Sequence, residues 1–307
     1  MAYRLKAGES VPENIRRIVI EELDSAIAQL RTRSIKKRDE AIHEARKGVK
    51  KIRGVLKLMR SGLGGTYKIE NEALRTIGAH LSELRDAGAL LETVNAMSEK
   101  YAEPAQQSAL RQLRKALERS KRETSLDAGK VMRAAAAGLL VIRGRVPGWP
   151  LKAGEFGGIA RGLEDSYRAG RKAMAMAAES DKPELFHEWR KRAKDHWYHV
   201  RLLEGLWADA TDGPEKGLHD LETWLGEEHN LFVLGERVKS DPDPFGGSEQ
   251  IDLLLALASD MHLELRRKSF DSGKRLYAEK PKKLVRRFGK LWDEWQAESQ
   301  HARTPTA

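Results

Sequence analysis

The stretches HEARKGVK (residues 43–50) and HEWRKRAK (residues 187–194) say most about the fold of this chain, because they repeat one pattern, H-E-x-R-K-x-x-K. Residue 187 follows residue 43 by 144 positions. Positions three and four apart lie on the same face of an α-helix, so the His, the Arg and the last Lys of each copy share a face. The repeat therefore predicts two helices that each present a basic surface.

The rest of the chain also has the apolar periodicity of helices. Residues 10–30, SVPENIRRIVIEELDSAIAQL, place Ser10 as an N-cap, Pro12 near the first turn and apolar side chains at three- and four-residue steps. Glycine- or proline-rich segments separate the other periodic stretches. We predict an all-α fold. Further helices are expected at residues 38–60, 69–101, 104–143, 155–179, 183–208, 214–238, 248–279 and 282–298.

A comparison of the chain with itself at the offset of 144 residues extends the match beyond the two basic stretches. The gapless matches include Ile15 with Ile159, Arg17 with Arg161, Leu58 with Leu202, Leu74 with Leu218, Leu81 with Leu225, Leu90 with Leu234 and Val94 with Val238. The longest helix-breaking segment, residues 147–158, lies between the copies. We predict a single domain over residues 1–307 that arose by internal duplication. Its antiparallel four-helix halves are residues 8–146 and 155–298, and the second half includes a C-terminal helix.

A helical wheel places the basic residues of each copy in one sector and the apolar residues opposite. The basic sector of the first copy contains His43, Arg46, Lys47, Lys50 and Lys57, with Arg53 at its margin. The basic sector of the second copy contains His187, Arg190, Lys191, Lys194 and Arg201. Gly54 and Tyr198 occupy equivalent places in the two sectors. The opposite sector of the first copy, which includes Ile42, Val49 and Ile52, is expected to face the core.

The charge of the first copy is almost entirely positive. Residues 43–60 contain seven Lys or Arg and one acid, Glu44. Like charges one turn apart destabilise a helix by about 0.2–0.5 kcal/mol per pair, and a bound polyanion would remove that cost. Arginine binds two oxygens of a phosphate with its planar guanidinium, while lysine contributes a mobile charge. A row of such residues at one-turn spacing suits an extended chain of phosphates, although a basic helix face is also a common form of solvated surface.

The composition limits the classes of function. The chain has 307 residues with 56 Lys and Arg against 46 acids, a formal charge of +10, which favours polyanionic partners. It has no cysteine, so disulfides and thiolate chemistry are excluded. The N-terminus lacks an apolar signal region, and the most apolar runs are short and carry charges. We therefore expect a soluble, cytoplasmic protein without a membrane partner.

The repeated basic motif and the helices that follow it resemble those of a known family. The repeated H-x-x-R-K-x-x-K helix is followed in each half by a later helix, with LSELRDAGALL at 81–91 and LGEEHNLFVL at 225–234. This arrangement is similar to the CHAD domain, the conserved histidine α-helical domain, over about residues 8–298. The resemblance implies two four-helix bundles related by a pseudo-twofold axis around a basic groove or pore. It also implies binding of inorganic polyphosphate and, in bacteria, association with polyphosphate granules.

The family's basic motif falls on the residues of the two basic sectors. The resemblance thus implies a polyphosphate site formed by His43, Arg46, Lys47, Lys50, Arg53, Lys57, His187, Arg190, Lys191, Lys194, Tyr198 and Arg201. The halves differ in two respects. Lys51 and Arg53 correspond to Asp195 and Trp197, so the second half contributes less charge. The pair Arg85-Asp86 becomes His229-Asn230 in the second half.

Three other segments are candidate sites. The segment KPKKLVRRFGKLW (280–292) carries Lys283, Arg286, Arg287 and Lys290 on one face, and these extend the anion site or form a solvated terminal helix. His196 and His199 have the spacing of a helical metal-ligand pair, but the neighbouring cations disfavour a dication, so no metal is expected. The segment SGLGGT (61–66) lacks the strand and the lysine of a P-loop and is interpreted as a turn between helices.

Four functions remain open from the sequence. The first is non-enzymatic binding of polyphosphate without a cofactor. The second is binding of nucleic acid, which is expected to be weaker because only Trp197 and Tyr198 are placed to stack on bases. The third is an enzyme acting on polyphosphate, which the lack of an evident carboxylate cluster disfavours. The fourth is a scaffold at granule surfaces, which is compatible with the first.

Overall fold

The computed structural model describes residues 3–124, 127–151, 156–207 and 214–301, and every regular element in these ranges is helical. The α-helices are α1 (Val11–Leu30), α2 (Arg38–Leu58), α3 (Arg60–Leu63), α4 (Gly65–Glu83), α5 (Asp86–Lys100), α6 (Pro104–Thr124), α7 (Ala128–Arg145), α8 (Gly157–Glu179), α9 (Pro183–Leu202), α10 (Pro214–Ser240), α11 (Ser248–Leu276) and α12 (Pro281–His301). Short 3-10 helices are η1 (Ile35–Lys37), η3 (Val146–Gly148), η4 (Glu204–Trp207) and η5 (Asp243–Phe245). The all-α prediction is confirmed.

The first helix begins where its sequence predicts. The Ser10 hydroxyl accepts a hydrogen bond from the Glu13 backbone N–H, and the Glu13 carboxylate accepts one from the Ser10 N–H at 2.8 Å. This capping box satisfies two backbone donors at the N-terminus of α1. The predicted apolar stripe of α1 is fully buried, as are Ile42, Val49 and Ile52 on the apolar side of α2. The phase of both helices therefore follows from their apolar periodicity.

Two of the predicted helices are each divided into two helices in the structure. Residues 69–101 are not one helix, because α4 ends at Glu83 and α5 begins at Asp86. Residues 104–143 likewise form two helices, α6 and α7, and residues 125–126 between them lie outside the described ranges. In both cases the apolar stripes on the two sides of the break are buried in different cores. A straight helix would not reach both.

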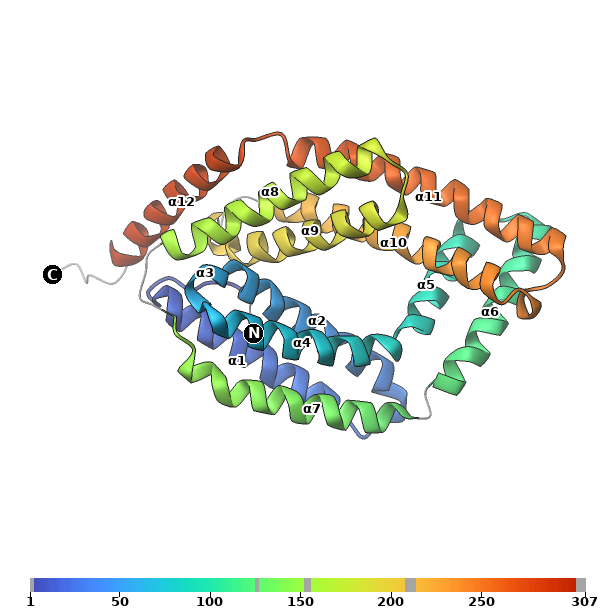
Figure 1. Ribbon diagram of the computed structural model, residues 1–307, viewed down its shortest axis with the longest axis horizontal. Coiled ribbons are helices and arrows are strands. Elements are labelled where there is room, and N and C mark those ends of the chain that lie inside the picture. The colour runs from blue at the N-terminus through green and yellow to red at the C-terminus, as the bar shows by residue number, and fades with distance from the viewer. Residues whose placement is uncertain (1–2, 125–126, 152–155, 208–213, 302–307) are drawn as a thin grey trace.

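The molecule contains two hydrophobic cores. The larger core includes the buried stripes of α1, α2, α4 and α7 together with those of α8, α9 and α12. The smaller core joins α5 and α6 to one end of α10 and α11. In Figure 1, the chain leaves the first bundle after α4, crosses to α10 and α11 through α5 and α6, and returns as α7. Both cores thus combine residues from before and after the segment 147–158.

The proposed duplication stays a prediction. The predicted start of the second half at residue 155 lies outside the described residues. The helices of residues 8–146 and those of residues 156–298 share cores instead of folding separately. This sharing has a functional consequence, because it holds the two basic helices, α2 and α9, against each other near the centre of the molecule (Figure 1).

Candidate anion-binding site

The two basic helices, α2 and α9, touch at the residues that the offset of 144 pairs with each other. A Cβ atom added to Gly54 would lie 3.0 Å from Cβ of Tyr198, so the small residue allows the close approach. Beside this contact, Nε2–H of His199 donates to the Gly54 carbonyl at 2.9 Å. The carbonyl group can only accept, which fixes the proton of neutral His199 on Nε2. The backbone of α2 is thereby joined to α9 at its centre.

Four of the predicted residues gather on one side of this contact and define what we call the central cluster. Arg46 and Lys50 come from α2, and Arg190 and Lys194 come from α9. The Lys194 ammonium forms an ion pair with Glu222 of α10, and Arg190 Nε lies 4.0 Å from the same carboxylate. Two cations of α9 therefore share one acid. Among the described residues, Arg46 and Lys50 form no ion pair.

Lys50 is a strongly perturbed cation of the central cluster. Burial, followed by repulsion from Lys194, Arg46 and Arg190, lowers the pKa of Lys50 to about 6, and the more distant Glu222 opposes this only in part. Burial also lowers the pKa of Lys194, but there the carboxylate of Glu222 acts against it. The offset of 144 pairs Lys50 with Lys194 and Glu222 with Gly78. The first half thus has a glycine where the second half has its neutralising acid.

The two repeated histidines lie apart from the central contact and have different surroundings. His43 is exposed on α2, where burial of its ring and the nearby Arg85 lower its pKa. His187 packs on the ring of His229, with ring centroids 4.3 Å apart, and burial followed by Lys191 and Arg190 lowers its pKa. Both histidines border cationic side chains. Both are therefore neutral near pH 7 in the free protein.

The remaining predicted residues of α2 and α9 are placed outside the central cluster. Arg53 donates to Asn71 at 3.1 Å, and Lys57 pairs with Asp195 at 2.6 Å. Arg201 lies over the ring of Trp197. The other two cations lie beside glutamates of their own helices. These are Lys47 with Glu44 at 3.5 Å and Lys191 with Glu188 at 2.5 Å.

The predicted extension on α12 lies away from the central cluster. The helix packs against α8 and η4 at one end of the molecule (Figure 1). Lys283, Arg286 and Lys290 are exposed on its outer face, and Arg287 pairs with Glu279 at 3.0 Å. The structure thus gives α12 an exposed basic surface but does not bring it into the central cluster.

Sequence reasoning missed one residue that shapes the central cluster, Glu222, and did not separate the roles of two others. Glu222, which pairs with the cations of α9, lies 28 residues after Lys194 in the sequence. No pattern in the sequence around it indicates that it pairs with them. Arg85 and Asp86 were noted as a pair, but their roles differ. Arg85 binds Glu92 at 2.5 Å, whereas Asp86 lies near Arg46 and acts against the burial that lowers the pKa of that residue. The break between α4 and α5 places both of them there.

His196 and His199, the candidate metal pair, make other contacts. Nδ1 of each ring lies within hydrogen-bond distance of the Ser166 hydroxyl, at 3.2 Å and 2.9 Å respectively. Burial lowers the pKa of His196 to about 3 and that of His199 to about 4, so both rings are neutral. Within the ranges that the structure describes, no three His, Asp or Glu side chains gather as a metal site. No described helix is long and apolar enough to cross a membrane.

The fold and the central cluster define an all-α protein with two basic helices from different parts of the chain held against each other. The family model of the CHAD domain matches residues 19–239, most of the chain. The protein belongs to the CHAD domain family. A crystal structure of the CHAD domain from the plant Ricinus communis is similar, with a TM-score of 0.62 and 17% identity over 91% of this chain and 95% of that one. The comparison with curated proteins gave no match.

Proposed function

We propose that this protein binds linear inorganic polyphosphate, without catalysing its cleavage, through the central cluster formed by Arg46, Lys50, Arg190 and Lys194. The observation that carries the proposal is the excess of positive charge where α2 meets α9. Of these four partly buried cations, only Lys194 and Arg190 approach an ion-pairing acid, Glu222. Asp86 near Arg46 and Glu228 near Arg190 offset the positive charge in part without forming an ion pair with either arginine. Such an arrangement is costly in the free protein, and a bound anion removes the cost.

The chemistry of the cluster suits a chain of phosphates more than a single small anion. Each of the two helices contributes one guanidinium and one ammonium group. A guanidinium group can bind two phosphate oxygens at once, and an ammonium group acts as a single mobile charge. Arg46 and Lys50 are one helical turn apart, as are Arg190 and Lys194. Successive phosphates of one polymer would meet successive cations. The same contacts would hold the protein on granules in which the polymer is concentrated.

Nucleic acid is the second candidate, and the surroundings of the aromatic residues disfavour it. Tyr198 is 3% exposed and Trp197 is 6% exposed, and Trp197 Nε1–H donates to Glu215 at 2.7 Å. Neither ring is free to stack on a base, which single-stranded nucleic acid requires for strong binding. Phosphate contacts alone would remain, so we expect nucleic acid to bind more weakly than polyphosphate of equal charge.

Calorimetric titration tests the proposal directly. Long-chain polyphosphate should bind more tightly than single-stranded DNA of equal charge, and its affinity should fall steeply with salt. The double variant Arg46→Gln/Lys50→Gln should reduce polyphosphate affinity about tenfold or more, because both residues lack ion-pairing partners that would compete with the ligand. It leaves the ion pairs of Glu222 intact, so the fold should be preserved.

A matched control separates the cluster from overall charge. The variant Arg267→Gln/Lys274→Gln removes one arginine and one lysine that are exposed on α11 and so lowers the formal charge of the sequence by the same amount. It should change polyphosphate affinity less than about twofold. Equal losses in the two variants would contradict the assignment of the site. Equal affinity of the native protein for polyphosphate and DNA would contradict the proposed ligand.

A further inference from the structure

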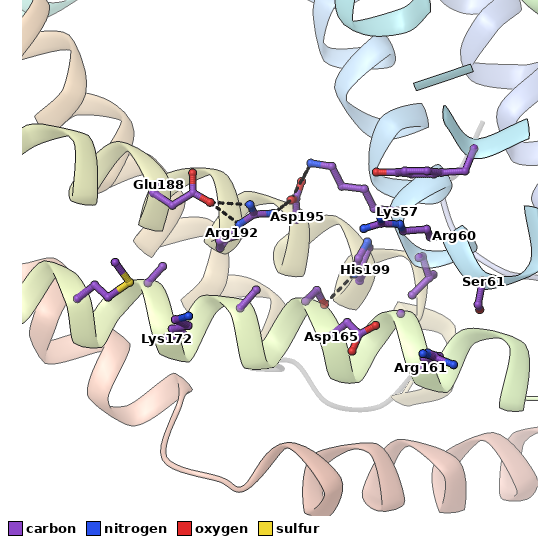
Figure 2. A pocket seen from close by; sticks show the side chains of 17 residues that line it. Lys57, Arg60, Ser61, Arg161, Asp165, Lys172, Glu188, Arg192, Asp195 and His199 are labelled. Atoms are coloured by element: carbon purple, nitrogen blue, oxygen red, sulfur yellow. Dashed lines mark hydrogen bonds and ion pairs between the residues drawn. The ribbon is translucent and has the colours of Figure 1, made fainter. Parts of the chain in front are cut away.

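A second basic region lies at the C-terminal end of α2. A cavity of about 1000 Å³ opens there between α3, α8 and α9. Figure 2 shows Arg60 and Ser61 of α3 at one end, Arg161, Asp165 and Lys172 along α8, and the ion-paired residues of α9 on the opposite wall. Arg60, Arg161 and Lys172 line the cavity from separate places in the sequence. Of the residues predicted to bind polyphosphate, Lys57 alone is among those that line the cavity.

The charges in this cavity are unevenly compensated. On the wall formed by α9, Asp195 pairs with Lys57 at 2.6 Å, and Glu188 pairs with Arg192 at 2.6 Å. Asp165 of α8 pairs with Arg168 at 3.7 Å. The three acids of the cavity are thus already matched by cations.

Three cations of the cavity have no acidic partner. Arg60 lies over the ring of Tyr67, with its guanidinium carbon 5.0 Å from the centroid. No ion pair is formed by Arg60, Arg161 or Lys172 within the part of the chain that the structure describes. The uncompensated charge of the cavity is therefore positive. It comes from side chains that are already exposed to an incoming anion.

The basic face of α2 connects the cavity with the central cluster. Arg46, Lys50, Arg53 and Lys57 follow one another at four- and three-residue steps, and Arg60 continues the series on α3. At 1.5 Å per residue, the part of the row within α2, from residue 46 to residue 57, is about 17 Å long. Arg53, between the two regions, is only half-buried and lies near Tyr67 and Asp195 of the cavity.

We propose that the cavity is a second segment of the same anion site, in which Arg60, Arg161 and Lys172 bind the distal phosphates of a polymer held at the central cluster. The proposal rests on the proposed function and specifies the ligand further. The full site selects a long linear polyphosphate over short ones, because only a long chain reaches both ends of the basic row. A short chain gains the contacts of one region alone.

The test compares two chain lengths of the same polymer. The triple variant Arg60→Gln/Arg161→Gln/Lys172→Gln removes the unpaired positive charge of the cavity. Because all three side chains are exposed, folding should be unaffected, as circular dichroism and the melting temperature will verify. We expect it to lose about tenfold in affinity for long-chain polyphosphate and less than twofold for tripolyphosphate. The matched control Lys36→Gln/Arg267→Gln/Lys274→Gln, with the same change in net charge, should lose less than twofold for both.

The other outcomes are distinguishable. If the cavity variant behaves like the control toward the long polymer, the cavity is not part of the site, and the central cluster stands by itself. If the cavity variant loses affinity for both lengths equally, tripolyphosphate binds in the cavity and the connected site is wrong. If the native protein binds neither length more tightly than single-stranded DNA of equal charge, the proposed function itself fails.

Discussion

At Lys50, burial favours the neutral amine, whereas binding of an anion favours the charged ammonium group. Its ammonium group lies among Arg46, Arg190 and Lys194, and its pKa of about 6 leaves it mostly neutral at pH 7 in the free protein. An anion bound beside it favours the charged form and raises this pKa. We therefore expect binding of polyphosphate to be accompanied by uptake of a proton at Lys50.

This coupling predicts how affinity depends on pH. Below about pH 5, Lys50 is almost fully protonated with or without ligand and contributes little pH dependence. Above pH 6, binding takes up a proton, so affinity should fall as pH rises, by up to about tenfold per pH unit until the pKa of the bound state is reached. Calorimetry at pH 7.5 in two buffers of different ionisation enthalpy measures the proton directly.

The variant Lys50→Arg isolates this effect, because arginine keeps its charge at every pH of the experiment. It should bind polyphosphate at pH 7.5 without the proton uptake and with a flatter pH profile. His43 and His187 have lowered pKa values and remain in both proteins, so any uptake that they cause below pH 6.5 is common to the two profiles. Identical proton uptake in the native protein and the variant would contradict the role of Lys50.

At the scale of the elements, close packing of α8 on the end of α2 depends on Gly162. A Cβ atom at this position would lie 2.0 Å from the Leu58 carbonyl oxygen. The variant Gly162→Ala should therefore destabilise the protein by about 3 kcal/mol or more, because the two helices must separate. Gly144 of α7 is the matched control, since nothing lies within 4 Å of its Cβ position. Gly144→Ala should raise stability by about 0.5–1 kcal/mol in urea unfolding.

Four buried or half-buried histidines of α9, α10 and α11 make the stability of the fold depend on pH. Folding lowers the pKa of His196 to about 3 and of His199, His229 and His262 to about 4. In the unfolded chain these rings bind protons below about pH 6.5. The unfolded state then holds more protons than the folded state, so stability should be highest above pH 6.5 and fall as pH decreases toward 4. Urea unfolding at pH 7 and pH 5 measures this loss, and a flat profile would show that the rings are not neutral inside the fold.

The sequence predicts where the helices lie along the chain better than it predicts which helices and side chains contact each other. The apolar stripes of α1 and α2 and the basic positions Arg46, Lys50, Arg190 and Lys194 follow from periodicity, which is a local property. The break at residues 84–85 does not, because both sides have helical periodicity and only packing separates them. Glu222 and the cavity cations Arg60 and Arg161 are also invisible to local patterns. Their roles depend on which helices become neighbours after the chain has crossed between the two cores.

For the whole molecule, that crossing explains why the two basic helices can be held together against their own repulsion. The larger core combines α1, α2, α4 and α7 with α8, α9 and α12, and the smaller one fixes α5 and α6 on α10 and α11. The basic helices thus contribute apolar faces to one common core while their cations meet at its edge. Burial of aliphatic and aromatic side chains, worth about 1.5–3 kcal/mol each, exceeds the cost of a few uncompensated charges.

The same architecture predicts that the bound polymer stays intact. Cleavage of a phosphoanhydride requires a group that positions or activates water, commonly a metal ion held by carboxylates. At the central cluster, Glu222 is bound by Lys194 and lies beside Arg190, and Asp86 lies near Arg46. In the cavity, the three acids are paired with cations. Long-chain polyphosphate incubated with the protein and Mg²⁺ or Mn²⁺ should therefore keep its length on a gel and release no phosphate beyond a protein-free control. Release that the variant Arg46→Gln/Lys50→Gln abolishes would show that the cluster is catalytic, since a contaminating phosphatase would be insensitive to that change.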